Sequence, residues 1–243
     1  MEFCRESFNH FAVEYAIGFY EEARTLSSGR KSHWYVNWRD VSNDLALLEI
    51  LADYVNKFTI DLDLKPDCYY GVPEGATKLG LLAQFKLASN SNKYDIGTHC
   101  MAMGRAKPKN HGEPKDRYFI GEPKGKTIIL EDVTTTGKSL MNEIMKILEL
   151  NNSKGSSKKT AEIIQAISLT DRMESINEEF GCGISKRESV KNALAMVDVP
   201  YCSMSNAREL LPLAYDRYKP IDKTVRAIEQ EYEKYGITSI KLR

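Results

Sequence analysis

The chain has 243 residues, of which 42% are hydrophobic, so it can bury a full core and is not a disordered sequence. Its 34 basic and 34 acidic residues cancel to a formal net charge of zero, which argues against nucleic-acid binding as its main task. The five cysteines lack the C-x-x-C spacing of a zinc site, so we expect reduced thiols. No apolar run approaches the length of a membrane span, and no leader pattern opens the sequence. We therefore expect a cytoplasmic protein without membrane contact.

The first forty residues predict a helix followed by a hairpin. A helix over residues 5–25 is predicted by apolar side chains at helical spacing, namely Phe8, Phe11, Ala12, Tyr15 and Phe19. The segment Ser27–Ser32 is typical of a turn, and the β-rich run His33–Arg39 follows it. Together these two segments predict a hairpin or hood element.

Strands and helices then alternate along the rest of the chain. The predicted strands cover residues 67–72, 98–103, 127–131, 162–169 and 200–203. The predicted helices cover residues 44–58, 76–87, 138–150, 185–196, 207–214 and 221–235. Alternation at this rhythm predicts an α/β protein with a mostly parallel sheet and helices on both faces. Ligands bind such sheets at the C-terminal ends of the strands.

The stretch Thr127–Leu140 carries the most information about function. An apolar strand runs into two acids, Glu131 and Asp132, and a hydroxyl-rich turn up to Gly137 then leads into a helix. The backbone N–H groups of such a turn, with the positive end of the helix, can hold a phosphate. The two carboxylates can accept hydrogen bonds from vicinal ribose hydroxyls or help to place a Mg²⁺ ion.

The tripeptide Gly137-Lys138-Ser139 also matches the end of the nucleotide-binding pattern G-x-x-x-x-G-K-[ST]. That pattern requires a glycine five residues before Gly137, where this chain has Asp132. A carboxylate at that position would face the nucleotide phosphates, so the ATPase interpretation fails.

The stretch Ile128–Ser139 resembles the phosphoribosyl-pyrophosphate (PRPP) signature of type I phosphoribosyltransferases. Three further segments resemble the orotate phosphoribosyltransferases within that family. These are Ser28–Ser32 with Tyr35–Asn37, similar to the N-terminal hood; Gly104–Gly112, similar to the mobile catalytic loop; and Asp171–Glu174, similar to the segment whose arginine meets the orotate carboxylate. The resemblance spans roughly residues 20–205 in family order.

The resemblance implies a type I phosphoribosyltransferase-like α/β fold, with a mostly parallel sheet flanked by helices. It implies one phosphoribosyltransferase domain over residues 1–243, with an N-terminal helix and small hood in 1–40, a core in 41–214 and an added C-terminal helical extension in 215–243. The implied reaction converts orotate and PRPP, with Mg²⁺, into orotidine 5′-monophosphate and pyrophosphate during de novo pyrimidine (UMP) synthesis. A homodimer is also implied, because the family's catalytic loop acts in the partner subunit's site.

The resemblance also assigns site residues. The implied catalytic residues are Lys109 and Asp132. The implied PRPP-binding residues are Glu74, Gly75, Arg105, Lys107, His111, Glu131, Val133, Thr134, Thr135, Thr136, Gly137, Lys138 and Ser139. The implied orotate-binding residues are Tyr35, Val36, Thr135 and Arg172. We expect PRPP itself to hold most of the Mg²⁺ coordination, so no residue is assigned as a direct metal ligand, although Glu131 and Asp132 are able to contribute.

The chemistry of the implied reaction fits these residue types. The transition state has oxocarbenium character, so the protein must neutralise the departing pyrophosphate and exclude water. The loop from Gly104 carries up to four cationic donors, which suit closure over pyrophosphate. The guanidinium of Arg172 can bind a carboxylate through two hydrogen bonds, which a neutral base does not need.

Alternatives remain open at this point. Another nucleobase, such as a purine, could replace orotate, although Arg172 and the basic loop argue against it. A PRPP-binding regulator without turnover is the alternative from a different class, since Ser27, Ala106 and Gly75 stand where the family commonly has basic residues. Arg172 could instead pair with Glu174 at the surface, and residues 104–115 could form an ordinary charged loop.

Overall fold

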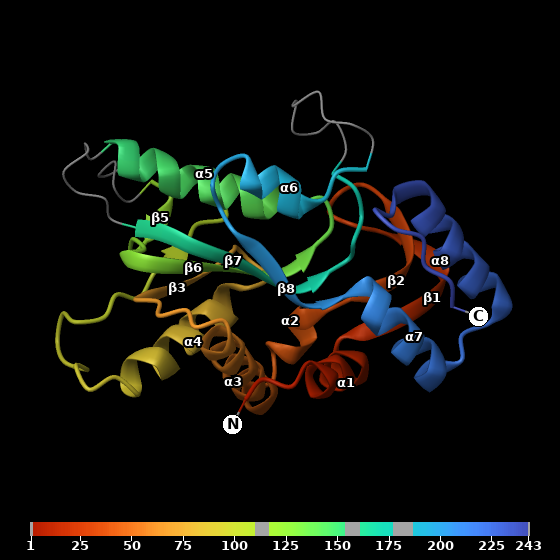
Figure 1. Ribbon diagram of the computed structural model, residues 1–243, viewed down its shortest axis with the longest axis horizontal. Helices are drawn as coiled ribbons and strands as arrows, with labels where there is room; N and C mark the ends of the chain where they lie inside the picture. The colour runs from red at the N-terminus through yellow and green to blue at the C-terminus, as the bar shows by residue number, and fades with distance from the viewer. Residues whose placement is uncertain (1, 110–116, 154–160, 177–186, 243) are drawn as a thin grey trace. The chain divides into compact units, whose positions relative to one another are not determined.

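The computed structural model describes residues 2–109, 117–153, 161–176 and 187–242 (Figure 1). The chain divides into two compact units, which are described in turn. The first unit comprises residues 1–3, 42–132 and 139–167, and the second comprises residues 4–41, 133–138 and 168–243. The single domain predicted over residues 1–243 stays a prediction.

A four-stranded, mostly parallel sheet has the strand order β3-β6-β7-β8. Its strands are β3 (Cys68–Gly71), β6 (Gly125–Thr134), β7 (Ala161–Asp171) and β8 (Tyr201–Asn206). Strands β3 and β6 pair in parallel, with Cys68 opposite Thr127 and Gly71 opposite Leu130. The apolar run Ile128–Leu130 is fully buried, as expected for a parallel strand covered on both faces. The predicted α/β class is therefore confirmed.

Helices cover both faces of the first unit's strands (Figure 1). Helices α3 (Leu45–Asp61) and α4 (Thr77–Ser89) lie on one face, and α5 (Lys138–Ser153) lies on the other. The side chain of Asp44 caps α3 by accepting a hydrogen bond from the Leu47 N–H at 3.0 Å. Helix α4 lies so close to β3 that a Cβ on Gly80 would be 2.5 Å from the Gly71 nitrogen.

A short antiparallel ribbon precedes β6 in the first unit. It consists of β4 (Met103–Gly104) and β5 (Phe119–Ile120), with Met103 opposite Ile120. The strand predicted over residues 98–103 is therefore wrong except at its last residue. The Thr98 hydroxyl accepts from the Asp95 N–H and donates to the Asp95 carbonyl, so this side chain closes a turn where a strand was expected.

The second unit begins with a helix that is shorter than predicted. Helix α1 (Arg5–Tyr15) is followed by β1 (Ile17–Thr25), which pairs antiparallel with β2 (Lys31–Val36). The helix predicted over residues 5–25 is thus wrong in its second half. Gly18 weakens a helix there, and the β-branched and aromatic residues around it suit a strand that has a partner. The predicted hairpin is confirmed, although it starts earlier, at Ile17.

The remaining helices of the second unit are α2 (Trp38–Val41), α6 (Val190–Ala195), α7 (Ala207–Tyr218) and α8 (Asp222–Tyr235). Helix α6 starts later than the predicted 185–196 because Ser189 caps it, accepting from the Asn192 N–H at 3.2 Å. Helix α8 buries Val225, Ile228 and Tyr232 and packs against the β1–β2 hairpin. Within the ranges described, no helix combines the length and apolar character that a bilayer span requires.

Candidate active site

The two acids of β6 lie inside the strand, because β6 continues to Thr134 beyond the predicted end at residue 131. Neighbouring side chains of a strand point to opposite faces. Glu131 is buried, with 6% of its surface exposed, and Asp132 is half-buried. The strand therefore presents the Asp132 carboxylate as the more accessible of the two acids.

The turn after β3 lies against this carboxylate in the first unit. The Val72 N–H donates to the Leu130 carbonyl at 2.8 Å, which holds the turn on β6. The peptide bond between Pro73 and Glu74 is cis, and the Glu74 side chain is exposed. A Cβ on Gly75 would lie 2.1 Å from Oδ2 of Asp132, so the carboxylate occupies the space that a side chain would need. The structure thus brings together two residues that were predicted for one site.

The predicted catalytic loop has a fixed stem. The Arg105 N–H donates to the Tyr118 carbonyl, and the Lys109 N–H donates to the Arg117 carbonyl, both at 2.8 Å. These bonds extend the β4–β5 ribbon, so Arg105 and Lys109 are carried on a paired backbone. The Lys107 side chain is exposed and that of Lys109 is half-buried. His111 lies outside the described residues.

A cavity of about 390 Å³ in the first unit is lined by the turn after β3, the loop stem and α5, and not by Glu131 or Asp132. It is lined by Pro73 of the turn, Ala106 and Tyr118 of the loop stem, and Ser139, Asn142, Glu143, Met145, Lys146 and Glu149 of α5. The Tyr70 hydroxyl donates to Glu143 at 2.6 Å, and Lys146 also pairs with Glu143. Burial, with the charge of the neighbouring Glu143 carboxylate, raises the pKa of Tyr70.

In the second unit, the segment Val133–Lys138 leads from β6 into α5. Thr134 and Thr136 are buried, Thr135 is half-buried, and Lys138 is exposed at the first helical position. Gly137 has a φ of +73°, which favours glycine, and a Cβ there would lie 2.8 Å from Cγ1 of Val190. The backbone therefore turns sharply just before the helix, as the predicted phosphate-binding segment requires.

Arg172 follows β7 directly, and its backbone N–H donates to the Thr134 carbonyl at 2.9 Å. Its Nε donates to Glu174 at 2.7 Å, and its guanidinium lies over the Trp34 ring, 4.1 Å from the centroid. The pairing of Arg172 with Glu174 that was considered as an alternative is therefore confirmed, but its surface location is wrong, since the two residues are 1% and 6% exposed. On β2, the predicted Tyr35 is half-buried and Val36 is 4% exposed.

Sequence reasoning missed the residues that surround Arg172. Arg30 shares the Glu174 carboxylate, with its Nη1 2.7 Å from Oε2. The Tyr232 hydroxyl of α8 donates to the Arg172 carbonyl at 2.9 Å. Arg30 lies in the motif Ser28–Ser32, so a signal for it existed, but nothing local marks Tyr232, whose partner is 60 residues away.

Cys68 and Cys100 are two cysteines of the first unit whose thiol pKa values depend on each other. The Gln84 side chain holds the backbone on both sides of the pair, accepting from the Tyr69 N–H and donating to the Cys100 carbonyl, both at 2.8 Å. The hydrogen bond from Cys68 lowers the pKa of Cys100 to about 6. The same hydrogen bond, with burial, raises the pKa of Cys68. Of the two thiols, Cys100 therefore ionises more readily, and it is also the more accessible.

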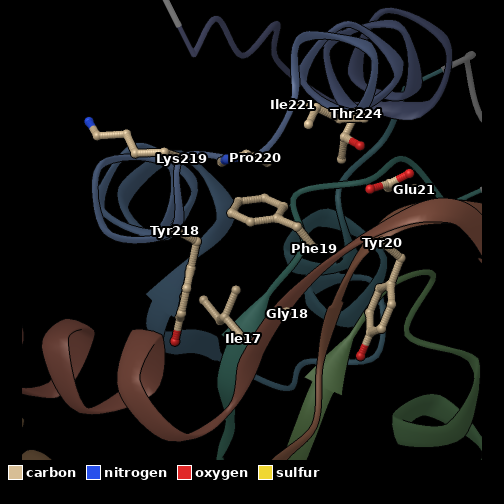
Figure 2. A pocket seen from close by; sticks show the side chains of 10 residues that line it. All are labelled: Ile17, Gly18, Phe19, Tyr20, Glu21, Tyr218, Lys219, Pro220, Ile221 and Thr224. Carbon is tan, nitrogen blue, oxygen red and sulfur yellow. The ribbon is translucent and has the colours of Figure 1, made fainter.

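A second cavity, of about 410 Å³, lies in the second unit between β1 and the segment that joins α7 to α8 (Figure 2). The Phe19 ring points into it beside Tyr218, with the ring centroids 6.4 Å apart, and the Lys219 side chain points away. Of the site residues predicted from sequence that the structure describes, none lines this cavity. It is separate from the groups discussed above, and we assign it no part in the site.

No protein-family model matches the chain. A crystal structure of an orotate phosphoribosyltransferase from Francisella tularensis has a TM-score of 0.61 at 22% identity, covering 95% of this chain and 99% of that one. The Mycobacterium tuberculosis orotate phosphoribosyltransferase in complex with PRPP has a TM-score of 0.53 at 15% identity, covering 85% and 98%. The chain therefore has the fold of the phosphoribosyltransferases.

A sequence relative identifies the family within that fold. The orotate phosphoribosyltransferase of Bradyrhizobium diazoefficiens is 32% identical over 166 residues, which cover 65% of this chain and 78% of that protein. The chain belongs to the orotate phosphoribosyltransferase family. This membership confirms the resemblance drawn from Ile128–Ser139 and the three further segments.

The thiol pair gives a prediction about reactivity. We expect the rate of Cys100 alkylation by iodoacetamide to rise with pH and to reach half its maximum near pH 6, because the thiolate is the nucleophile. Cys68→Ala removes the hydrogen-bond donor, so the midpoint should move up toward about 8.5. Mass spectrometry of the Cys100 peptide measures both profiles, with Cys202→Ala as the control. A wild-type midpoint at the ordinary thiol value would contradict the pairing.

Proposed function

We propose that this protein catalyses transfer of the 5-phosphoribosyl group from PRPP to orotate, giving orotidine 5′-monophosphate and pyrophosphate for pyrimidine synthesis. The segment Glu131–Ser139 carries the proposal. It joins two acids on a buried strand to a hydroxyl-rich turn with Gly137 in the left-handed conformation, immediately before a helix. Such an arrangement suits a phosphorylated sugar, and the Mycobacterium tuberculosis protein of the same fold binds PRPP.

The PRPP-binding roles follow the chemistry of each group. The backbone and hydroxyls from Val133 to Ser139 hold the 5′-phosphate at the positive end of α5. Asp132, the more accessible of the two acids, accepts hydrogen bonds from the ribose hydroxyls. The contact between Gly75 and the Asp132 carboxylate supports a role for the Glu74–Gly75 turn on the pyrophosphate side.

Mg²⁺ is the cofactor that we propose. Among the described residues, no group of three or more His, Cys, Asp or Glu side chains could hold a metal by itself. Mg²⁺ commonly binds through one or two carboxylates together with substrate phosphates and water. The half-buried Asp132 carboxylate and the neighbouring Glu131 offer such oxygen donors. Bound to PRPP, the ion would neutralise charge on the pyrophosphate.

Catalysis depends on neutralising the pyrophosphate as it departs. The bond between ribose C1 and the pyrophosphate oxygen breaks while a ring nitrogen of orotate bonds to C1 and loses its proton, which leaves with the pyrophosphate or to water. Lys109 is the catalytic lysine, placing positive charge where negative charge develops, and Arg105 and Lys107 bind the same group. The stem bonds of Arg105 and Lys109 support this role, because a fixed stem limits where the loop can close.

The orotate-binding role of Arg172 is supported by charge. The group formed by Arg30, Glu174 and Arg172 contains two positive charges and one negative charge. Such a group favours an anionic base over a neutral one. Three of the five guanidinium N–H groups of Arg172 have partners among the described residues, which leaves two for a carboxylate. Tyr35, Val36 and Thr135 complete the proposed base site.

We further propose a cytoplasmic homodimer, in which the loop from Gly104 completes the partner subunit's site. The support for this arrangement is the similarity of Gly104–Gly112 to the loop that the family shares between subunits. Size-exclusion chromatography with light scattering would measure the oligomeric state. Restored activity on mixing a loop variant with an Asp132→Asn variant would support sharing of the site.

The activity is tested by following orotate absorbance after mixing the protein with orotate, PRPP and Mg²⁺, with adenine, hypoxanthine and uracil in parallel. We expect loss of orotate that requires PRPP. Conversion of another base without loss of orotate would show that the protein is specific for that base and would refute the orotate assignment. Binding of PRPP without turnover of any base would instead indicate a regulator.

The variant Lys109→Ala tests the catalytic lysine. We expect kcat to fall by roughly 10²–10³-fold, because charge stabilisation in the transition state is lost, while the KM for PRPP changes much less. Steady-state kinetics with both substrates measure this split. Lys93→Ala, which alters an exposed lysine outside the proposed site, is the control. An unchanged kcat in Lys109→Ala would overturn the assigned role.

The variant Gly75→Ala tests the contact with Asp132. The new Cβ would displace the carboxylate, and loss of its charge-assisted hydrogen bond should raise the KM for PRPP at least roughly tenfold. Asn92→Ala is the control, since Asn92 is exposed and lies outside the proposed site. Equal KM values for the two variants would show that Asp132 does not need its observed position.

A further inference from the structure

The carboxylate of Glu231, on the C-terminal helix α8, binds the hairpin strand β2. The Ser32 hydroxyl donates to Oε2 at 2.6 Å, and the His33 N–H donates to Oε1 at 2.8 Å. The His33 ring Nδ1 also lies 2.6 Å from Oε1. The Glu231 side chain is only 15% exposed, so these bonds are shielded from water. Glu231 thus fixes a short stretch of β2 that was identified from sequence as part of the hood.

The Ser32 hydroxyl links Glu231 to the guanidinium of Arg172. Its oxygen accepts from Nη2 of Arg172 at 2.9 Å and from the Trp34 N–H at 3.3 Å. A serine hydroxyl has one donor and two acceptor positions, so all three positions of Ser32 are used. Because the single proton points to Glu231, both lone pairs are left for N–H donors.

Helix α8 holds Arg172 at its backbone as well. Tyr232, the next residue after Glu231, donates its hydroxyl to the Arg172 carbonyl at 2.9 Å. The Tyr232 ring lies 6.4 Å from that of Trp34, over which the Arg172 guanidinium is stacked. Two consecutive residues of α8 are therefore linked to Arg172. Glu231 is linked to its guanidinium through Ser32, and Tyr232 binds its backbone carbonyl directly.

We propose that Glu231 is a positioning residue for Arg172, acting through the Ser32 hydroxyl, and that it thereby sets how tightly the carboxylate of the base is held. This inference rests on the proposed function, in which Arg172 binds that carboxylate. It assigns the C-terminal helix a part in base recognition.

The substitution Glu231→Gln tests the direction of the hydrogen bonds. A glutamine amide facing Ser32 can donate to its oxygen, which turns the serine proton toward Arg172 and opposes the Nη2 hydrogen bond. Glu233→Gln is the matched control on the same helix, because the Glu233 side chain is 60% exposed and pairs with Lys241 at 3.3 Å. Ser32→Ala and the double variant with Glu231→Gln complete a cycle.

Steady-state kinetics of the full chain give the first readout. We expect Glu231→Gln to raise the KM for orotate roughly tenfold, with the KM for PRPP within about twofold of wild type. Glu233→Gln should change neither value. The double variant should be no worse than Ser32→Ala, since both changes act on one hydrogen-bond path. Parallel rises in both KM values, or additive effects in the cycle, would refute the proposal and indicate a general structural role.

A second readout needs no turnover. In the wild-type protein, NMR of the arginine side chains should show separate, slowly exchanging Nη signals for Arg172. We expect those signals to average in Glu231→Gln and to persist in Glu233→Gln. If wild-type protein fails to convert orotate but the signals change as expected, the proposed function fails and the positioning of Arg172 stands. If the signals are the same in all variants, the positioning role itself is wrong.

Discussion

The carboxylate of Glu174 is the constraint on which the second unit depends, because two buried guanidinium groups share it. Its two oxygens each lie 2.7 Å from a different arginine, Arg30 from the β1–β2 turn and Arg172 from the end of β7. Removing one partner of a buried ion pair commonly costs roughly 3–5 kcal/mol, because a charge is left without compensation. One side chain therefore joins the hairpin to the end of the strand that leads into Arg172.

The two substrates of the proposed reaction are served by different kinds of structure. The segment proposed to bind the phosphate is contiguous, and its shape depends on a strand end, a left-handed Gly137 and a helix start. The surroundings of Arg172 come from the hairpin, β7 and α8, which lie far apart in the sequence. The shape of the contiguous segment depends only on residues near it in the sequence. The position of Arg172 depends on the hairpin, β7 and α8, so a change in any of these three elements can alter it.

That difference explains what the sequence could predict. The strand, turn and helix around Glu131–Ser139, the α/β alternation and the helix of residues 221–235 follow from local patterns, and the structure has them within a few residues. Residues 17–25 were predicted as helix because Phe19 continues the apolar spacing of α1, and pairing with β2 overrides that spacing. Residues 98–102 have strand-like composition, but the Thr98 hydroxyl bonds close a turn. Glu231 has no local signal, since its role arises only from contact with Ser32.

The position of α8 in the chain has a consequence for maturation. Ser32 and its partner Glu231 are separated by 199 residues. At a synthesis rate of about 5–20 residues per second, the ribosome adds Glu231 roughly 10 to 40 seconds after Ser32. A growing chain can therefore fold the turn of residues 133–138 while the Ser32 hydroxyl still lacks Glu231 as its acceptor. In the nascent protein, the proposed phosphate-binding segment is therefore complete before the proposed base site.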